Sequence, residues 1–347
     1  MITPATVFSY LLEHGYVTAA SAVDGDFRVT DLSRRNRSFR VSTVSAGYVV
    51  KQARKRRPGY FATLDRESDC YWLAQNDPDF APIAKVMPRC WAYDASRHVL
   101  ILELLSSGEN LEQYHGRIGK LPVETARLLG DTLGAWHSGM EDAIRNKRPE
   151  VFPAEIPWML SADMAGAADF ESVSEANREL LRIIGKYETF GRALEDLRTK
   201  WVANTLIHGD LKWDHCILVN PGDPARELRI VDWEFADIGD GCWDAGAVLQ
   251  AYLHLWVQSV TDDPLEEIQP AIRAFWQAYA GRLGATGSAA ADMLERSVGY
   301  AALRMIQTAR ENLATVSEIG AEEVRLLQVS QNILASPKEA VQRLFGS

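Results

Sequence analysis

The stretch from residue 205 to residue 244 constrains the fold most, because short apolar segments alternate there with clusters of acidic residues. Polar loops join three segments with the length and composition of strands, at residues 205–207, 216–219 and 228–232. Asp210 and Asp232 are therefore expected on adjacent strands, where rigid supports fix each carboxylate. Phosphoryl transfer needs one carboxylate that orients the attacking hydroxyl and accepts its proton, and another that holds a metal ion on the phosphates. Asp210 and Asp232 have the residue type and the spacing for these two tasks.

The first hundred residues predict a small antiparallel sheet with a single helix. The helix is expected near residues 60–75, and short β-rich segments bounded by turns cover residues 27–29, 37–44 and 47–51. The apolar run from His98 to Leu105 predicts one more strand, which leaves this lobe through the polar connector Ser106-Ser107-Gly108. We therefore place a lobe boundary after residue 105.

Helices dominate from Pro122 onward, where apolar residues recur at helical spacing. One helix is expected over residues 123–137, with a stop at Ser138-Gly139. Further helices are expected from Trp243 onward and over residues 174–201, 271–282 and 293–313. The fold class is therefore predicted as α+β, with a sheet-rich lobe at residues 1–105 and a helical lobe at residues 106–347.

Length and composition fit two lobes of an ordinary globular protein, since the 347 residues are 47% hydrophobic and 24% charged. The longest nearly apolar run, from Ala245 to Val257, is too short to span a bilayer, and the N-terminus lacks the features of a signal peptide. The four cysteines show no metal-ligand spacing. We therefore expect a cytoplasmic protein without a membrane partner.

The net charge of −10 conceals a basic segment near the N-terminus. Residues 28–57 contain ten Lys or Arg and one acidic residue, Asp31. The phosphates of a nucleotide would suit this segment, although charge alone favours a solvated basic edge. Aromatic residues do not interleave with the basic ones and no DNA-binding motif accompanies them, so nucleic acid is not an expected partner.

Four short motifs follow one another along the chain: Leu133-Gly134-Ala135-Trp136-His137, His208-Gly209-Asp210, Ile230-Val231-Asp232-Trp233-Glu234 and Trp243-Asp244. Together they resemble the aminoglycoside phosphotransferase and choline kinase-like family, over roughly residues 25–310. The resemblance implies a protein-kinase-like two-lobe fold, with nucleotide bound by the N-terminal lobe and with catalysis and acceptor binding in the C-terminal lobe. It also implies ATP and Mg²⁺ as cofactors and an alcohol group as the acceptor. By the same resemblance, Asp210 would be the catalytic base that takes the hydroxyl proton, and Asp232 would bind the metal.

The resemblance assigns a lysine and a glutamate to the nucleotide. Lys51 is similar to the strand lysine that holds the α- and β-phosphates, and Glu67 to the helix carboxylate that pairs with it. Taken by itself, Lys51 could be an ordinary edge-strand lysine. Asp65 and Asp69 lie near enough to replace Glu67 if the helix register differs.

Two backbone segments are also implicated by the resemblance. Residues 33–41 resemble the family's nucleotide-covering loop but contain no glycine, so polar groups would come from Ser33, Asn36 and Ser38. The connector strand, from Glu103 to Leu105, would present backbone groups to the adenine.

One position departs from the family pattern. The pattern HGDxxxxN places an asparagine beside the metal, whereas the eighth position here is His215. A neutral imidazole can bind a divalent ion, but magnesium prefers oxygen. His215 could bind metal through nitrogen, a second ion could be left to water and phosphate, or activity could be lost. The presence of Lys51, Asp210 and Asp232 argues against loss.

The leading hypothesis is an ATP- and Mg²⁺-dependent phosphotransferase that moves the γ-phosphate to a hydroxyl of a small polar or cationic molecule. One alternative is a kinase of Ser or Thr hydroxyls in a ribosomally made natural-product peptide. Another is an inactive nucleotide-binding scaffold that docks a partner enzyme of its pathway. A metal-dependent hydrolase is a weaker alternative, because it leaves the Lys51 strand unexplained.

Overall fold

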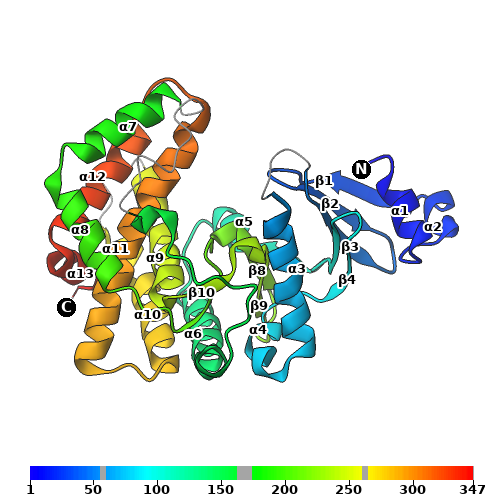
Figure 1. Ribbon diagram of the computed structural model, residues 1–347, viewed down its shortest axis with the longest axis horizontal. Helices are drawn as coiled ribbons and strands as arrows, with labels where there is room; N and C mark the ends of the chain where they lie inside the picture. The colour runs from blue at the N-terminus through cyan, green and yellow to red at the C-terminus, as the bar shows by residue number, and fades with distance from the viewer. Residues whose placement is uncertain (55–59, 162–173, 260–264, 347) are drawn as a thin grey trace. The chain divides into compact units, whose positions relative to one another are not determined.

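The structure of the protein is a computed structural model that describes residues 1–54, 60–161, 174–259 and 265–346 (Figure 1). The chain divides into two compact units. The first unit combines residues 1–113 with residues 214–236, and the second combines residues 114–213 with residues 237–347. The acidic stretch around Asp232 therefore returns to the N-terminal unit, although it follows a long helical segment in the sequence.

A five-stranded antiparallel sheet forms the centre of the first unit, in the order β1-β2-β3-β5-β4 (Figure 1). Its strands are β1 (Arg28–Asp31), β2 (Arg37–Ser42), β3 (Gly47–Gln52), β4 (Cys90–Asp94) and β5 (Val99–Glu103). Side chains alternate between core and solvent along β2, where Phe39 and Val41 are buried and Arg40 is exposed. The four predicted strands are thus confirmed with small shifts of their ends. The sequence does not reveal β4, whose pairing with β5 is interrupted by a register shift between Cys90 and Ala92.

Two short helices that the sequence does not predict, α1 (Val7–Glu13) and α2 (Ala19–Val23), precede the sheet. Val7 and Leu11 of α1 are buried in one apolar core with Phe39, Val50 and Ile101 of the sheet. A helix of seven residues is unstable by itself in water. Packing against the sheet therefore stabilises α1, and a local sequence pattern cannot reveal that contribution.

The predicted helix near residues 60–75 is confirmed as α3 (Tyr60–Asn76). Its buried face carries Glu67, Cys70 and Tyr71, while Trp72 is exposed. A short helix, α4 (Ala81–Ala84), follows. Helix α3 therefore holds a carboxylate inside the first unit.

Two smaller sheets carry the acidic loops. Strands β6 (Gly108–Asn110), β8 (Cys216–Val219) and β9 (Glu227–Ile230) form one of them, and β7 (Thr205–Ile207) pairs with β10 (Asp237–Gly239) in the other. The expectation that Asp210 and Asp232 follow adjacent strands is wrong, because Asp210 follows β7, Asp232 follows β9, and these strands belong to different sheets. Sequence order is misleading here because β7 pairs with a strand that comes after both loops.

Helices make up most of the remaining chain (Figure 1). They are α5 (Leu111–Ile118), α6 (Val123–Asn146), α7 (Glu175–Gly185), α8 (Glu188–Thr199), α9 (Gly241–Gln258), α10 (Gln269–Arg282), α11 (Gly287–Asn312), α12 (Ala321–Ala335) and α13 (Pro337–Phe345). None of the helices in the described part of the chain is both long and apolar enough to cross a membrane.

Two predicted helix boundaries are wrong. Helix α6 continues through Ser138-Gly139, because both residues are exposed and the buried residues Met140 and Ile144 follow them. Serine and glycine there cost about 1 kcal/mol of helix propensity, which burial of the apolar face outweighs. The helix expected over residues 174–201 is two helices, α7 and α8, separated by Lys186 and Tyr187.

Helices α6 and α10 pack with unusually close backbones at two glycines of α6. A Cβ atom added to Gly130 would lie 2.2 Å from the carbonyl oxygen of Phe275, and one added to Gly134 would lie 2.8 Å from that of Tyr279. A backbone oxygen stands in the way in both cases, and it cannot rotate away. Glycine at these positions therefore sets the distance between the two helices.

We expect the substitution Gly130→Ala to lower the free energy of unfolding by about 1–3 kcal/mol, because the added methyl group overpacks the α6–α10 interface. Urea denaturation of the purified protein measures the change. The matched control is Gly191→Ala at the end of the first turn of α8, where an added Cβ meets no atom within 4 Å. That variant should gain about 0.5–1 kcal/mol from helix propensity. A Gly130 variant as stable as the parent would show that α10 can shift without cost.

Candidate active site

A buried ion pair joins the sheet to α3 in the first unit. Lys51 Nζ, on β3, donates hydrogen bonds to Glu67 Oε1 at 2.7 Å and to Glu67 Oε2 at 2.9 Å. The Glu67 side chain is 0% exposed and the Lys51 side chain 10%. A third partner, Asp232 Oδ1, lies 2.5 Å from Lys51 Nζ. The structure thus brings together Lys51, Glu67 and Asp232, and it makes Glu67, rather than Asp65 or Asp69, the helix partner of the lysine.

The charges in this cluster shift each other's proton affinities. Burial by itself lowers the pKa of the Lys51 ammonium, but the carboxylates of Asp232 and Glu67 more than offset it and hold that pKa above its ordinary value. Burial raises the pKa of the Glu67 carboxyl, and Lys51 opposes that shift. The lysine therefore keeps a fixed positive charge of the kind that a phosphate group needs.

Asp232 is held in a strained backbone conformation beside His215. Its φ of 70° lies in the left-handed region, which costs a residue other than glycine about 1–2 kcal/mol. His215 Nε2 lies 3.3 Å from Asp232 Oδ2. Strain of this kind persists only where the surrounding structure fixes the residue, and it is common at functional sites. The two residues predicted to bind metal are therefore neighbours in the first unit.

The donor set around Asp232 fits a magnesium ion that is carried mainly by phosphates. In the described part of the chain, no group of three or more His, Cys, Asp or Glu side chains is arranged to hold a metal by itself. Magnesium in nucleotide-dependent enzymes takes only one or two carboxylates from the protein and completes its shell with water and phosphate oxygens. Asp232 is 32% exposed and supplies a hard oxygen donor of that kind, whereas the nitrogen of His215 is a poorer match.

The covering loop is fastened within the first unit by its own polar residues. Ser33 Oγ accepts a hydrogen bond from the backbone N–H of Ser38 at 3.1 Å. Asn36 is buried and donates from Nδ2 to Glu234 Oε2 at 2.9 Å. Burial, together with the nearby charge of Asp232, raises the pKa of the Glu234 carboxyl. The predicted loop residues thus hold the loop in shape, and their contact with nucleotide stays a prediction.

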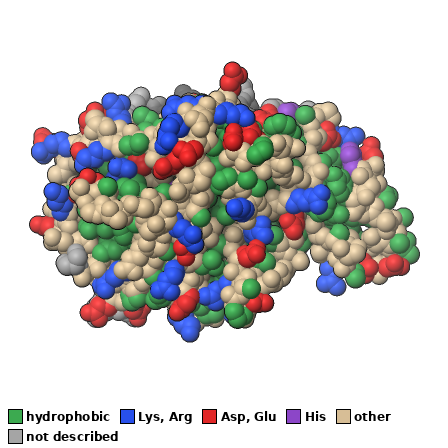
Figure 2. Space-filling model, turned by 90° about the horizontal axis from the view of Figure 1, so that it is seen from below, with side chains coloured by type: hydrophobic (Ala, Val, Ile, Leu, Met, Phe, Trp, Pro, Cys, Tyr) green, Lys and Arg blue, Asp and Glu red, His purple; other side chains and the backbone are tan. Residues whose placement is uncertain are grey.

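Two arginines of the covering loop also contact the acidic residues at positions 214 and 234, and no sequence motif marks these contacts. Arg34 Nη1 lies 3.2 Å from Asp214 Oδ2, and Arg35 Nη1 lies 3.7 Å from Glu234 Oε1. The Arg35 guanidinium also lies over the ring of Phe235, at 4.9 Å from its centroid. The basic segment is therefore partly neutralised within the first unit. On the face displayed in Figure 2, Lys and Arg side chains are likewise interspersed with Asp and Glu.

The last residue of β5 and the connector that follows it make several hydrogen bonds within the first unit. The N–H of Glu103 donates to the carbonyl of Arg89 at 2.8 Å, and the N–H of Gly108 donates to the carbonyl of Leu105 at 3.0 Å. The Glu103 carboxylate accepts from the N–H of Arg89 at 3.0 Å. The turn is well defined, and contact of Glu103 and Leu105 with adenine stays a prediction.

In the second unit, Asp244 anchors the loop that we call the catalytic loop, residues 208–212. The Asp244 carboxylate accepts hydrogen bonds from the N–H groups of His208 at 2.6 Å and of Gly209 at 3.1 Å. Trp243 Nε1 donates to the carbonyl of Gly209 at 3.0 Å. The Trp243-Asp244 pair at the start of α9 therefore fixes the backbone just before Asp210.

Two cations contact the Asp210 carboxylate in the second unit. Arg304 Nη2 of α11 donates to Asp210 Oδ1 at 2.9 Å, and Lys212 Nζ lies 3.2 Å from Asp210 Oδ2. The sequence pattern predicts a helix around Arg304 but indicates no role for that residue. Its partner lies 94 positions earlier, and no motif spacing connects the two.

A buried histidine packs against the end of the catalytic loop. The ring of His115 lies 4.5 Å from that of Trp213 and 6.4 Å from that of Tyr252, between centroids. Neither ring nitrogen of His115 has a hydrogen-bond partner in the described structure. Burial lowers the pKa of His115 to about 4. His115 is therefore a neutral aromatic spacer for Trp213 at physiological pH.

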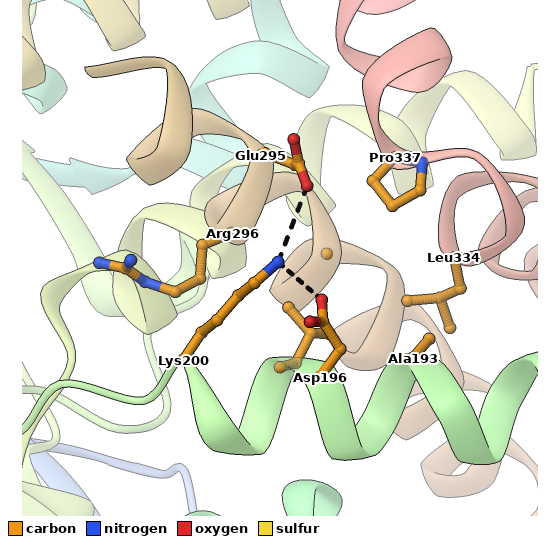
Figure 3. Close-up of a pocket in the computed structure, with 9 residues that line it drawn as sticks. Ala193, Asp196, Lys200, Glu295, Arg296, Leu334 and Pro337 are labelled. Atoms are coloured by element: carbon orange, nitrogen blue, oxygen red, sulfur yellow. Dashed lines mark hydrogen bonds and ion pairs between the residues drawn. The ribbon is translucent and has the colours of Figure 1, made fainter. Parts of the chain in front are cut away.

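A small pocket of about 60 Å³ lies among α8, α11 and the end of α12 in the second unit (Figure 3). Lys200 reaches across it and lies 2.7 Å from Asp196 Oδ2 and 3.9 Å from Glu295 Oε1. None of the predicted site residues lines this pocket. Its charges neutralise one another, so we assign it no ligand.

A model of the phosphotransferase enzyme family matches residues 28–285. No curated protein matches the chain in sequence.

Three solved structures resemble the chain over most of its length. An ethanolamine kinase from Plasmodium vivax is 12% identical, with a TM-score of 0.61 over 96% of this chain and 89% of that one. A microcompartment-associated aminopropanol kinase is 15% identical, with a TM-score of 0.60 over 98% of both chains. A choline kinase from Streptococcus pneumoniae is 15% identical, with a TM-score of 0.53 over 95% of this chain and 99% of that one. Likeness at such identities shows the fold, and it confirms the predicted protein-kinase-like class with a small sheet-rich part and a mostly helical remainder.

We expect the neutral state of His115 to make stability depend on pH. The folded-state pKa of about 4 lies below the ordinary value of 6.5, so the unfolded chain binds the proton more tightly. The contribution to stability is therefore complete above the ordinary pKa and is lost as the pH falls toward the folded-state pKa. At about 1.4 kcal/mol per pKa unit, the loss reaches up to about 3 kcal/mol.

Urea denaturation at pH 7.5 and pH 4.5 measures this loss. The variant His115→Phe keeps an aromatic ring without a titrating nitrogen, and it should lose less stability between the two pH values than the parent. The control His14→Gln removes an exposed histidine and should behave like the parent. Equal losses for parent and His115→Phe would contradict the assignment.

Proposed function

The chain belongs to the phosphotransferase enzyme family, and from this premise we propose that it transfers the γ-phosphate of ATP, with Mg²⁺, to a hydroxyl group of a small polar or cationic molecule. Family membership makes the protein a phosphotransferase with an alcohol group as acceptor. The observation that carries the finer proposal is the buried contact of Lys51 with both Glu67 and Asp232. A lysine held between a helix carboxylate and a metal-binding aspartate suits the phosphates of a nucleotide.

We assign the residues to roles as follows. Lys51, oriented by Glu67, steadies the α- and β-phosphates, and Asp232 with His215 holds the metal. Magnesium, when bound, would neutralise charge on the phosphate oxygens. Asp210 orients the acceptor hydroxyl and takes its proton as the new oxygen–phosphorus bond forms and ADP departs. Residues 1–105 would bind the nucleotide, with Ser33, Asn36 and Ser38 in the covering loop and Glu103 and Leu105 at the adenine, and residues 106–347 would bind the acceptor.

A small amino alcohol is the acceptor class that we favour. The structural neighbours carry the names of kinases for ethanolamine, aminopropanol and choline, and each of these molecules pairs one hydroxyl with a cationic nitrogen. The chain's net charge of −10 also favours a cationic partner. Among the described residues, no observation favours a peptide hydroxyl or an inactive scaffold over this proposal.

We expect Asp210→Asn to lower the rate of transfer by about 10²–10⁴-fold, because the amide cannot accept the hydroxyl proton. Labelled ATP with choline, ethanolamine, 1-amino-2-propanol or spectinomycin as acceptor measures transfer, and a parallel series with GTP measures nucleotide choice. The affinity for the nucleotide should stay within about twofold of the parent, because the proposed role of Asp210 lies in the transfer step and not in nucleotide binding. Asp142→Asn, at a side chain that is 83% exposed, is the control and should transfer normally. Transfer by Asp210→Asn within tenfold of the parent would refute the role of Asp210.

We expect His215→Asn to retain transfer with Mg²⁺ and to lower the rate with Mn²⁺ relative to the rate with Mg²⁺, because nitrogen donors favour Mn²⁺ over Mg²⁺. The ratio of the Mn²⁺ rate to the Mg²⁺ rate should fall several-fold. Titration of Mn²⁺ into protein that holds a non-hydrolysable ATP analogue, followed by electron paramagnetic resonance, gives a readout independent of turnover. Complete loss of transfer would show that the imidazole has a role other than metal binding.

A further inference from the structure

The side chains around Asp210 form a closed ring of contacts in the second unit. Arg304 Nη2 donates to Asp210 Oδ1 at 2.9 Å, and Arg304 Nη1 donates to Gln307 Oε1 at 2.9 Å. Gln307 Nε2 donates to Glu311 Oε1 at 2.8 Å. Lys212 Nζ closes the ring, at 3.4 Å from Glu311 Oε2 and 3.2 Å from Asp210 Oδ2. One face of α11 thus supplies three of the five members, at positions 304, 307 and 311.

The two sides of this ring differ in burial. The Arg304 side chain is 4% exposed, whereas those of Lys212 and Glu311 are 36% and 49% exposed. A buried, planar guanidinium with several hydrogen bonds is held in one orientation. A partly exposed ammonium at 3.2–3.4 Å from its partners exchanges more readily with solvent or with another anion than a buried guanidinium does. The contact to Oδ1 is therefore fixed, and the contact to Oδ2 is replaceable.

Arg304 holds more of the catalytic loop than the aspartate. Its Nη2 atom also lies 3.4 Å from the carbonyl oxygen of Leu211. Its guanidinium lies over the ring of Trp243, at 5.6 Å from the centroid, and that indole donates to the carbonyl of Gly209. One side chain thus connects Leu211, Asp210 and the tryptophan that holds Gly209. Loss of Arg304 would release the loop on both sides of the aspartate.

Helix α11 lies outside the part of the chain that the family model matches. The match ends at residue 285, and α11 runs from Gly287 to Asn312. The family match therefore does not cover Arg304, the residue of this helix that contacts Asp210.

We propose that Arg304 is a positioning residue that fixes Oδ1 of Asp210, so that Oδ2 is the oxygen that meets the acceptor hydroxyl. This inference rests on the proposed function. Lys212 occupies Oδ2 while no acceptor is bound and then remains on Glu311 when the hydroxyl takes its place. The hydroxyl proton passes to Oδ2 as the hydroxyl oxygen bonds to the γ-phosphorus, and the bond from that phosphorus to the bridging oxygen breaks with its electron pair leaving on ADP.

Two substitutions at Arg304 and one control test the proposal. Arg304→Gln removes the charge and most of the hydrogen bonds, and Arg304→Lys retains the charge. The control is Arg296→Gln, two turns earlier on the same helix, where Arg296 Nε lies 2.7 Å from Asp240 Oδ2. It removes another arginine–aspartate pair from α11, at an arginine that is 16% exposed and that contacts Asp240 and not the catalytic loop.

The first readout is the rate of phosphate transfer to choline, ethanolamine or 1-amino-2-propanol. Without an added acceptor, the rate of transfer to water is measured. We expect Arg304→Gln to lower kcat by about 100-fold, because the loss of one contact that preorganises an active site has an effect of that size. The KM for ATP should stay within about twofold of the parent value. Arg304→Lys should recover to within about tenfold of the parent, and Arg296→Gln should keep kcat within about threefold. A parent-like kcat for Arg304→Gln, or an equal loss in Arg296→Gln, would overturn the proposal.

Amide hydrogen exchange gives a second readout that needs no acceptor. The N–H groups of residues 208–212 should exchange at least about tenfold faster in Arg304→Gln than in the parent, and unchanged exchange there would overturn the proposal whatever the kinetics. In Arg296→Gln these amides should exchange at the parent rate. If the parent transfers phosphate to none of the acceptors or to water, the proposed function fails, and hydrogen exchange still decides whether Arg304 holds the loop.

Discussion

The arrangement of the first unit depends on one buried cation, the ammonium of Lys51. It contacts Glu67 from α3 and Asp232 from the segment after β9, so three separate stretches of chain meet at one charge. A buried pair adds little net stability when it is complete, but an unpaired buried charge costs about 3–5 kcal/mol. The contact therefore specifies how α3, β3 and Asp232 are arranged more than it stabilises them. It also explains how Asp232 can keep a left-handed backbone conformation, since its side chain is held from two directions.

In the second unit, side chains from two helices hold the catalytic loop in place. Two backbone N–H groups point at the Asp244 carboxylate, the Trp243 indole holds a carbonyl, and Arg304 reaches the loop from α11. Each of these side chains lies on a long helix whose other residues are buried in the unit. A short loop that would otherwise fluctuate is thus attached to two rigid elements. Rigidity of this kind matters for phosphoryl transfer, because positioning and electrostatic stabilisation account for nearly all of its catalysis.

The sequence predicts those parts of the structure whose signal is local. The strands around Lys51 and the helix around Glu67 follow from residue type and periodicity, and the acidic motifs stand directly after short strands. The missing parts depend on contacts between distant residues. Helix α1 depends on burial against the sheet, α6 passes Ser138-Gly139 because its far end is buried, and β7 pairs with a strand beyond both acidic loops. Arg304 belongs to the same class, since nothing around it in the sequence distinguishes it from other helical arginines.

Asp210 and Asp232 are held in the same way, which the sequence motifs alone do not reveal. In each, Oδ1 contacts a largely buried cation, Lys51 for Asp232 and Arg304 for Asp210, while Oδ2 faces a second side chain. A carboxylate with a single exposed partner rotates about its terminal bond, and ordering it during the reaction would cost conformational entropy. Anchoring one oxygen removes that freedom in advance and leaves the other oxygen aimed in a defined direction. Preorganisation of this kind lets a weak base or a single metal ligand act at full effect, because no reorganisation is required when the substrate arrives.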